Sequence, residues 1–428
     1  MLAKVASLIA EHDGLIGDMV TINLGREATI REITVEVSDD EHAERIADVL
    51  GEIDGIEVLW HRDRALMRHE GGKLTVEARV EVKTLQDTRD VYTPGVARVA
   101  QAIADDPSQA QRYTMIGRTV AICTNGTRVL GLGDVGPRAS MPVMEGKAVF
   151  YRQFAGISAM PILIDADAPD EFVEAVKRIA PTFGGIHLED ISAPECFEIE
   201  RRLSEDLAVP VMHDDVHGTA VVTLAAAIVA SRQADLELRE ATVGQLGLGA
   251  AGIGIAELMV DGGCERVLAS DPDGSTHDRA REKGIEIVEL DQLMDEANVV
   301  VASTGQPGLI EPDMVNDGQV ILALSNPDPE IRPDDALEEG AAFALDGSSV
   351  NNVLGYPGIF RGALLAGAEE IDLEMKLAAA RAIADIAEQS ELVPDPLDPK
   401  VHEHVAEAVC QAAKDSGAAR PDHAATAL

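Results

Sequence analysis

The chain has 428 residues, of which 46% are hydrophobic and 3% aromatic. This length allows two or three globular domains, and aliphatic side chains must build most of their cores. Its 76 acidic and 35 basic residues give a net charge of −41. A protein surface with this much negative charge repels nucleic acids and anionic lipids, so we expect neither as a partner. We interpret the acids as a solvated coat and infer adaptation to high salt, which screens their repulsion.

The four cysteines are scattered and form no CxxC pair. This is typical of reduced thiols in a cytoplasmic protein, rather than of a disulfide framework or a zinc site. The sequence shows neither a signal-peptide pattern nor a run of about eighteen apolar residues, so we expect no membrane span.

Residues 1–70 are predicted to form a small α+β module. Helical spacing covers Leu2–Glu11, alternating strands cover Met19–Asn23 and Ile30–Val37, a second helix follows, and Gly55–Trp60 forms a last strand. The order α-β-β-α-β resembles an ACT regulatory domain that lacks its first strand. Two functions are about equally consistent with this module, a small-molecule sensor and a packing or dimerisation element, since an unpaired edge strand invites pairing with another chain.

The remainder of the chain is predicted to be α/β. Short apolar runs alternate with helical patterns from about residue 241 to residue 347, which is typical of buried parallel strands. The strands are expected at Val243–Leu246, Val267–Ser270, Ile285–Val288, Val299–Ala302 and Val320–Leu324. Two further helices are expected near the end of the chain, at Leu373–Glu388 and Pro399–Asp415.

A glycine-rich loop, GLGAAG, joins the first of these strands to a predicted helix. Its first two glycines permit a tight turn and bring backbone N–H groups close to a pyrophosphate at the helix N-terminus. The next strand ends in Asp271, nineteen residues past the loop, where a dinucleotide fingerprint has an acid for the ribose hydroxyls. That acid would repel a 2′-phosphate, so NAD is favoured over NADP. A glycine turn used only for helix packing is the less consistent alternative. The candidate cofactor-binding residues are Gly247, Gly249, Ala250, Ala251, Gly252 and Asp271.

Two pairs of adjacent acids, Glu189-Asp190 and Asp214-Asp215, each follow a short apolar run and lie near glycines. Carboxylates gathered at strand ends suit a hard divalent cation with oxygen ligands. Adjacent strand residues point to opposite faces, so both members of a pair can bind one ion only where the strand has ended. Solvated surface acids are the alternative, but His187 and His213 beside the pairs favour a metal site.

Lys147 and Tyr92 are further candidates for proton transfer. Lys147 lies in an apolar, glycine-dense stretch, where partial burial would lower its proton affinity and let it act as a base. The alternative is a lysine whose stem packs on a helix while its ammonium reaches solvent. Tyr92 precedes a Pro-Gly turn and could donate a proton, or could be a hydrogen-bonded packing residue.

Together these motifs resemble malic enzymes of the shorter bacterial and archaeal form. The resemblance runs from about Val80 to Gly367 and is carried by seven stretches in order: VYTPGVA, VLGLGDVGP with MPVMEGKA, PTFGGIHLEDISAPECFEIE, VMHDDVHGTA, GLGAAGIGIA, LSNPDPE and NNVLGYPGIFRGAL. The same family includes malolactic enzyme, which shares the site but releases lactate.

The resemblance implies a role for each candidate residue. Glu189, Asp190 and Asp215 would bind Mg²⁺ or Mn²⁺, which chelates malate. Lys147 would be the base and Tyr92 the acid, with Asp214 beside Lys147. Substrate would contact Arg128, Asn326 and Asn352, and Asn326 would also contact the cofactor.

The expected architecture has an ACT-like module at 1–70, a catalytic α/β domain at 71–235, a Rossmann-type domain with a doubly wound parallel sheet at 236–365, and C-terminal helices with a tail at 366–428. The expected reaction is (S)-malate + NAD → pyruvate + CO₂ + NADH, with NADP as a possible cofactor. Malate is the expected partner, together with a second copy of the chain in a homodimer or larger assembly and a possible effector at the N-terminal module. The alternatives are malolactic activity and a non-catalytic NAD-responsive regulatory protein, against which the intact lysine, tyrosine and acids argue.

Overall fold

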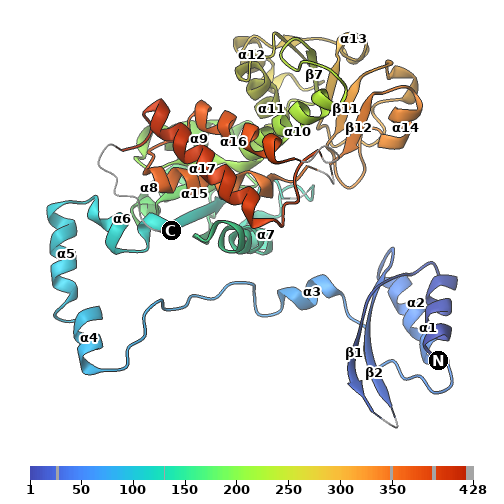
Figure 1. Cartoon of the computed structure of the whole chain (residues 1–428), viewed down its shortest axis with the longest axis horizontal. Coiled ribbons are helices and arrows are strands. Elements are labelled where there is room, and N and C mark those ends of the chain that lie inside the picture. Colours follow the sequence, from blue (N-terminus) through green and yellow to red (C-terminus); the bar gives the residue numbers. More distant parts are fainter. Residues whose placement is uncertain (26–27, 130, 348–349, 388–391, 421–428) are drawn as a thin grey trace. The chain divides into compact units, whose positions relative to one another are not determined.

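The computed structural model describes residues 1–25, 28–129, 131–347, 350–387 and 392–420 (Figure 1). It divides into two compact units, Met1–Lys73 and Leu74–Leu428, which are taken separately below. Among the described residues, none of the helices combines the length and the apolar character needed to cross a bilayer.

The N-terminal unit pairs a two-stranded antiparallel sheet with helices on one face. Its elements are α1 (Leu2–Glu11), β1 (Leu15–Leu24), β2 (Thr29–Glu36), α2 (Asp40–Gly51) and α3 (Arg64–His69). A small core forms where Val5 and Ile9 of α1 meet Ile46 of α2 over β2. The helix and the two strands expected at the start of the chain are therefore present, and α2 begins just after the second strand.

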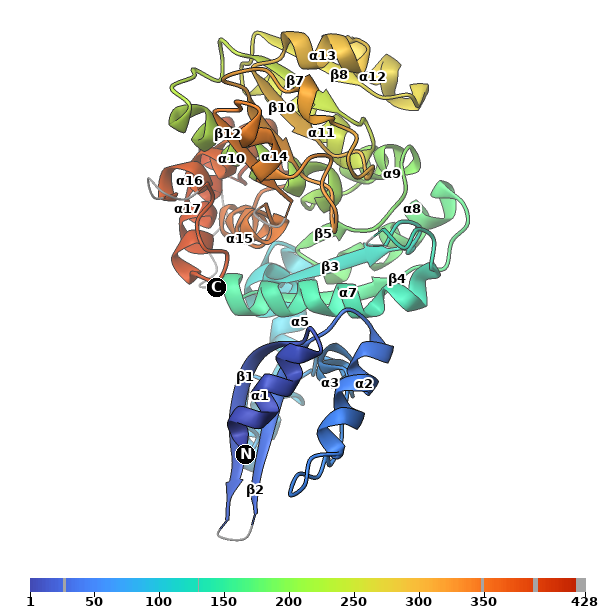
Figure 2. The ribbon, with the colours of Figure 1, turned by 90° about the vertical axis from the view of Figure 1, so that its right-hand side faces the viewer.

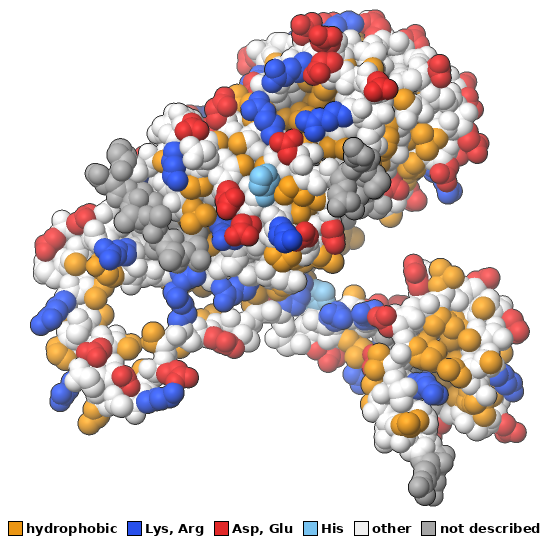
Figure 3. Space-filling view, in the orientation of Figure 1, with side chains coloured by type: hydrophobic (Ala, Val, Ile, Leu, Met, Phe, Trp, Pro, Cys, Tyr) orange, Lys and Arg blue, Asp and Glu red, His pale blue; other side chains and the backbone are white. Residues whose placement is uncertain are grey.

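The strand expected at Gly55–Trp60 is wrong, because this segment has no strand pairing in the structure. Ile56 instead packs against the core formed by α1, α2 and β2. This apolar side chain of the segment is therefore covered by the helices and not by strand pairing at a sheet edge. Hydrophobic side chains also lie exposed on this unit (Figure 3). Those on β1 that are more than half exposed are Leu15, Val20, Ile22 and Leu24.

The second unit begins with three short helices, α4 (Leu85–Val91), α5 (Val96–Asp105) and α6 (Gln109–Tyr113). None of the three contains a buried side chain. A four-stranded parallel sheet follows, in the order β4-β3-β5-β6. Its strands are β3 (Thr119–Thr124), β4 (Ser158–Leu163), β5 (Gly185–Leu188) and β6 (Val211–His213).

Helices cover both faces of this sheet, as the alternation of its central strand requires. Val120 and Ile122 of β3 share a core with α7 (Gly136–Phe150), which runs along one face of the sheet (Figure 2). Ala121 and Cys123 share a second core with α8 (Pro169–Ile179) and α9 (Glu195–Asp206). The sheet is therefore buried on both sides, and only the ends of its strands are available for a site.

A six-stranded parallel sheet has the order β12-β11-β10-β7-β8-β9, which is the doubly wound order of dinucleotide-binding folds. Its strands are β7 (Thr242–Leu246), β8 (Arg266–Ser270), β9 (Glu286–Ile287), β10 (Val299–Ala302), β11 (Val320–Ala323) and β12 (Phe343–Asp346). The five predicted strands are present, and β12 is an additional edge strand. The helices on its faces are α10 (Thr219–Gln233), α11 (Ala250–Asp261), α12 (His277–Glu282), α13 (Leu290–Glu296) and α14 (Pro333–Glu338).

Three helices complete the unit, α15 (Tyr356–Ala366), α16 (Leu373–Ile386) and α17 (Pro399–Ser416). The last two were predicted, although residues 388–391 lie outside the described part of the chain. Gly358 and Gly362 allow α17 to approach α15 closely, since a Cβ atom there would lie 2.7 Å from Val405 and 2.6 Å from the carbonyl oxygen of Ala406. Tyr356 and Phe360 of α15 in turn share a core with α7, so the C-terminal helices return to the four-stranded sheet.

Short helical turns connect these elements. The 3₁₀ turns are Ile116–Arg118, Ala180–Thr182, Gly274–Thr276, Pro312–Met314 and Asn352–Leu354, and the π-helical turns are Tyr151–Ala155 and Asp214–Gly218.

Candidate active site

Both acid pairs directly follow strands of the four-stranded sheet. Glu189 and Asp190 come immediately after β5, and Asp214 and Asp215 come immediately after β6 and open a π-helical turn. Because β5 and β6 are parallel neighbours, their carboxyl ends lie at the same edge of the sheet. The condition that each strand ends before its acid pair is therefore met.

The turn after β5 brings three carboxylates together. One oxygen atom from each of Glu189, Asp190 and Asp215 lies within 4.8 Å of the others. Asp190 has a φ of +53°, a left-handed conformation that takes the chain out of the strand direction, and its backbone N–H donates to Asp215 Oδ2 at 2.9 Å. The two loops are therefore tied together at the point where their acids meet.

These three carboxylates fit a divalent cation. Glu189 and Asp190 are buried, and Asp190 Oδ2 has no hydrogen-bond partner among the described residues. Burial, with the charge of neighbouring carboxylates, raises the pKa of Glu189 and of Asp190 to about 8. A cluster of buried acids that lacks enough positive charge suits a bound cation, and ligands that are all oxygen atoms favour Mg²⁺ or Mn²⁺.

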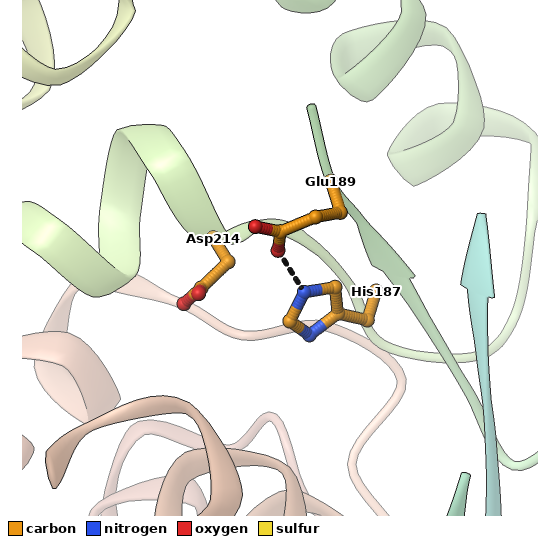
Figure 4. A group of neighbouring side chains, drawn as sticks. All are labelled: His187, Glu189 and Asp214. Carbon is orange, nitrogen blue, oxygen red and sulfur yellow. Dashed lines mark hydrogen bonds and ion pairs between the residues drawn. The ribbon is translucent and has the colours of Figure 1, made fainter. Parts of the chain in front are cut away.

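A second set of neighbouring side chains consists of His187, Glu189 and Asp214 (Figure 4). His187 Nε2 lies 2.6 Å from Glu189 Oε2, and its Nδ1 lies 2.8 Å from the hydroxyl of Tyr151. Burial lowers the pKa of His187 to about 3, so the imidazole is neutral. Because both ring nitrogens are already hydrogen-bonded within the protein, this set is the weaker candidate for binding an ion.

Lys147 projects from α7 into the same region. Its Nζ lies 2.5 Å from Asp214 Oδ2, 2.9 Å from Glu189 Oε1 and 4.7 Å from the centre of the Tyr356 ring. Burial alone lowers the pKa of Lys147, but the carboxylates of Asp214 and Glu189 outweigh it and raise that pKa well above its usual range. The expectation that burial weakens its hold on the proton is therefore wrong in sign, and the ammonium is buried rather than directed to solvent.

Asp214 is enclosed on all sides. It is fully buried, and its Oδ2 accepts hydrogen bonds from Lys147 Nζ and, at 2.7 Å, from Asn352 Nδ2. Burial raises the pKa of Asp214 to about 6, although Lys147 opposes the change. A carboxyl group with this pKa is largely ionised at neutral pH, as its ion pair with the Lys147 ammonium requires.

The turn that holds Asp214 and Asp215 is supported from outside. Glu200 of α9 accepts from the backbone N–H of His213 at 2.8 Å and lies 3.0 Å from His217 Nε2. Lys376 of α16 lies 3.2 Å from the other ring nitrogen of His217. The α9 and C-terminal helices therefore fix the backbone that carries the acids.

The glycine loop lies between β7 and α11, as predicted. Gly247 has a φ of +83°, and a Cβ atom at Gly252 would lie 2.0 Å from the carbonyl oxygen of Gly247. Asp271 follows β8 and accepts from the N–H of Leu248 at 2.5 Å. The loop therefore requires glycine for its turn and its helix packing, and the first turn of α11, with Ala250 and Ala251, presents free backbone N–H groups, so these residues fit a dinucleotide.

The glycine loop also approaches the four-stranded domain. A Cβ atom at Gly249 would lie 3.6 Å from the Arg128 guanidinium, and the backbone N–H of Arg128 donates to the carbonyl oxygen of Asp190. Asn326 lies three residues past β11 and is exposed. Arg128 thus stands between the acid cluster and the cofactor loop.

The structure does not bring Tyr92 to the acid cluster. It follows α4 as its C-cap residue and is 71% exposed. Its hydroxyl makes no hydrogen bond to the described residues. The helices on either side of it bury no side chain, so nothing within this unit holds Tyr92 against the acid cluster.

Sequence reasoning did not identify Tyr151 and Tyr356 as residues that pack beside the candidate site. The chain has only four tyrosines, and these two are almost fully buried beside Lys147 and His187. Tyr151 follows Lys147 by four residues, which places it one helical turn further on the same face. That spacing could have identified Tyr151 from the sequence as a neighbour of Lys147.

Three parts of the chain match known protein families. Residues 73–204 match the family described as the malic enzyme N-terminal domain, and residues 342–415 match the malic enzyme NAD binding domain. Residues 221–306 match the NAD binding domain of D-isomer specific 2-hydroxyacid dehydrogenases.

Two relatives and one solved structure are similar over most of their length. The chain is 50% identical over 416 residues to NAD-dependent malic enzyme 1 of Bacillus subtilis, covering 96% of this chain and 94% of the relative. It is 41% identical over 445 residues to the NAD-dependent malic enzyme of Geobacillus stearothermophilus, covering 98% and 93%. The crystal structure of malic enzyme from Pyrococcus horikoshii OT3 superposes with a TM-score of 0.79 at 36% identity, covering 84% of this chain and 92% of that one.

Proposed function

This chain belongs to the malic enzyme family, and from that premise we infer that it catalyses the oxidative decarboxylation of malate to pyruvate and CO₂ with a nicotinamide cofactor. The observation that carries this reading is the cluster of Glu189, Asp190 and Asp215 beside the buried Lys147–Asp214 pair. We further propose that NAD is the preferred cofactor and that Mg²⁺ or Mn²⁺ is required.

Glu189, Asp190 and Asp215 would hold the cation, because together they offer oxygen ligands from two adjacent loops. When bound, a divalent cation acts as a Lewis acid that polarises the oxygen atoms of the substrate. Gly247, Gly249 and Asp271 would hold NAD, which would supply the acceptor for the hydride from the C2 carbon of malate. Side chains of the protein itself would carry out the remaining steps.

Lys147 Nζ would take the proton of the C2 hydroxyl. It can do so only in its neutral form, and Asp214 Oδ2, at 2.5 Å, is the group that can first receive the ammonium proton. The pKa of Asp214, about 6, makes it a stronger proton acceptor than an ordinary aspartate, although Lys147 holds the proton far more strongly in this structure. Asn352 holds the same carboxylate oxygen at 2.7 Å and keeps it directed at Lys147.

Arg128 would bind a carboxylate of malate, because its planar fork matches that group and it lies between the acids and the glycine loop. Asn326 would contact substrate and cofactor from the end of β11. We propose NAD rather than NADP because the Asp271 carboxylate, which follows β8, would repel a 2′-phosphate. Both reported relatives are named as NAD-dependent enzymes.

Tyr92 would protonate the enol carbon. For this role the segment from α4 to α5 must pack against an acid cluster. Tyr92 is exposed in the isolated chain, so one chain alone does not hold it against such a cluster. We therefore propose a homodimer or larger assembly in which the uncovered apolar side chains of this segment are buried. Light scattering should give a mass of at least two chains, and Leu85→Asp with Val96→Asp should shift it towards one.

For the N-terminal unit we propose an ACT-like role, either in sensing a small molecule or in association. The α-β-β-α order and the exposed apolar side chains of β1 support it. Substituting Val20→Asp and Ile22→Asp should lower the assembly mass if the unit associates. An unchanged mass, with turnover altered by a small-molecule effector, would favour sensing.

One assay tests the proposed reaction. Initial rates should be measured with malate, Mn²⁺ and each nicotinamide cofactor, with pyruvate and lactate quantified separately. Pyruvate and free NADH in equal amounts are expected. Lactate without free NADH would instead indicate malolactic activity, and no turnover would favour a non-catalytic NAD-responsive protein.

A further inference from the structure

Three buried side chains form a hydrogen-bonded series behind the acid cluster. The Tyr151 hydroxyl lies 2.8 Å from His187 Nδ1, and His187 Nε2 lies 2.6 Å from Glu189 Oε2. We propose that Tyr151 and His187 are positioning residues that fix the Glu189 carboxylate in the orientation needed to bind the divalent cation. The inference rests on the proposed function, in which Glu189 is a metal ligand.

The order of donors and acceptors in this series is set by its two ends. The carboxylate form of Glu189, which is the form that would bind a cation, can only accept, so in that form Nε2 of His187 must carry the hydrogen of the 2.6 Å contact. In a neutral imidazole Nδ1 is then an acceptor, and the Tyr151 hydroxyl is the donor that reaches it. Tyr151 therefore selects the tautomer of His187 in which Nε2–H points at the carboxylate.

Packing keeps the imidazole in this direction. The His187 ring lies against Phe360, with ring centres 5.6 Å apart, and meets the edge of Tyr356 at 5.3 Å. His187 is fully buried on β5, two residues before Glu189. A ring held by neighbours on two sides cannot turn away from the carboxylate without disrupting the core.

The Glu189 carboxylate is held by contacts to both of its oxygen atoms. His187 holds its Oε2, and Lys147 Nζ lies 2.9 Å from its Oε1. The carboxylate is thus fixed from both oxygen atoms and cannot rotate, while a carboxylate oxygen retains a further lone pair for a cation. Groups that orient metal ligands in this way typically change metal affinity about 10- to 100-fold when they are removed.

The test compares Mn²⁺ affinity of the full chain, measured by electron paramagnetic resonance or calorimetry without malate or NAD. Tyr151→Phe removes only the hydroxyl, and His187→Phe removes both ring nitrogens. His187→Gln is the conservative variant, because its amide can place a donor near the position of Nε2. Tyr356→Phe is the matched control, because the Tyr356 hydroxyl is buried in the same aromatic cluster but has no hydrogen-bond partner among the described residues.

The expected dissociation constant for Mn²⁺ rises about 10- to 100-fold in His187→Phe and about 5-fold in Tyr151→Phe, as for one lost hydrogen bond. His187→Gln should recover part of the loss, and Tyr356→Phe should bind as the original chain does. In ¹⁵N-histidine spectra, Tyr151→Phe should change the ring-nitrogen signals that His187→Gln removes.

Normal Mn²⁺ affinity in both Tyr151→Phe and His187→Phe would overturn the proposal while the proposed function stands. If His187→Phe does not fold, Tyr151→Phe and His187→Gln decide between the two outcomes. If the original chain itself binds no Mn²⁺, the proposed function and this inference both fall. Equal losses in Tyr151→Phe and the control Tyr356→Phe would reduce the effect to core packing and would also overturn the proposal.

Discussion

Lys147 and Asp214 form a buried ion pair, with 2.5 Å between Nζ and Oδ2, although 67 residues separate them in the chain. Lys147 comes from α7, on one face of the four-stranded sheet, and Asp214 comes from the turn after β6. The pair exists only when the sheet and its covering helix are both folded. It therefore couples the stability of the domain to the group that we propose as the base.

Lys147→Met should abolish most turnover and also lower stability. Loss of a general base reduces the rate about 10²- to 10⁴-fold, and the buried carboxylates of Asp214 and Glu189 lose their cation, which destabilises by about 3–5 kcal/mol. Steady-state rates, thermal unfolding and NAD titration would measure this, with NAD binding retained. Lys177→Met is the control, since Lys177 pairs with Asp206 at 2.8 Å on the surface. Near-normal rates in Lys147→Met would contradict the assignment.

Asp190→Asn should weaken Mn²⁺ binding by at least about 100-fold, more than the 10- to 100-fold typical for the loss of an outer hydrogen-bond partner. The substitution keeps the size of the side chain but replaces one carboxylate of the three-acid cluster. Calorimetric titration with Mn²⁺ measures the change. Asp206→Asn, in a surface ion pair, is the matched control. Equal affinity in Asp190→Asn and the control would exclude Asp190 as a ligand.

The metal-free protein should lose stability as pH rises from about 4 to about 8. The pKa values of Glu189 and Asp190 are about 8 in the folded chain but about 4 in an unfolded one, so the folded state holds more protons across this window. Mn²⁺ binds the ionised carboxylates, and its stabilising effect should therefore be larger at pH 8 than at pH 6. Melting temperatures with EDTA and with Mn²⁺ check this. A larger effect of Mn²⁺ at pH 6 would refute it.

Asp271→Asn should shift cofactor preference towards NADP, by roughly tenfold in the ratio of kcat/KM values, or about 1.4 kcal/mol. The amide removes the negative charge and keeps an acceptor for the Leu248 N–H. The comparison requires rates with both cofactors at saturating malate. Asp273→Asn serves as the control, because Asp273 is an exposed acid that caps Ser275 two residues further on. No change in the ratio would show that Asp271 does not face the 2′ position.

Added KCl should raise the melting temperature by several degrees between low and molar salt. The net charge of −41 places many carboxylates near one another, and screening within about 3 Å at 1 M removes most of their repulsion. A melting series against KCl measures this. Equal stability at low and molar salt would argue against adaptation to high salt.

The strands of the six-stranded sheet were readable where apolar runs were bounded by glycine or by acids, and the short apolar runs before the two acid pairs correspond to β5 and β6, whereas β3 and β4 were not predicted. Val299–Ala302 was predicted with the bounds it has in the structure, because it is buried on both faces and uniformly apolar. β12 (Phe343–Asp346) was missed, because an edge strand of mixed polarity has no such pattern. Gly55–Trp60 has the pattern but pairs with no strand, which shows that alternation records burial of alternate side chains and not strand pairing.

Local sequence patterns predicted the acid pairs and the glycine loop of the candidate site, but not the pKa of its buried lysine. The acid pairs and the glycine loop follow from local spacing, since each lies at the end of one strand. The raised pKa of Lys147 depends on Asp214, which local sequence does not place beside it. The exposure of Tyr92 likewise depends on what packs against α4 and α5, and the sequence around Tyr92 contains no information about that contact.

The close contact of α17 with α15 through Gly358 and Gly362 has a consequence for biosynthesis. α15 supplies the rings that enclose His187 and the ammonium of Lys147, and α17 holds α15 in place. Because α17 starts at Pro399, it leaves the ribosome long after the residues around which it closes the core. The core around the acids and the lysine is therefore incomplete until α17 has been made, and a ribosome stalled before α17 should carry an inactive enzyme.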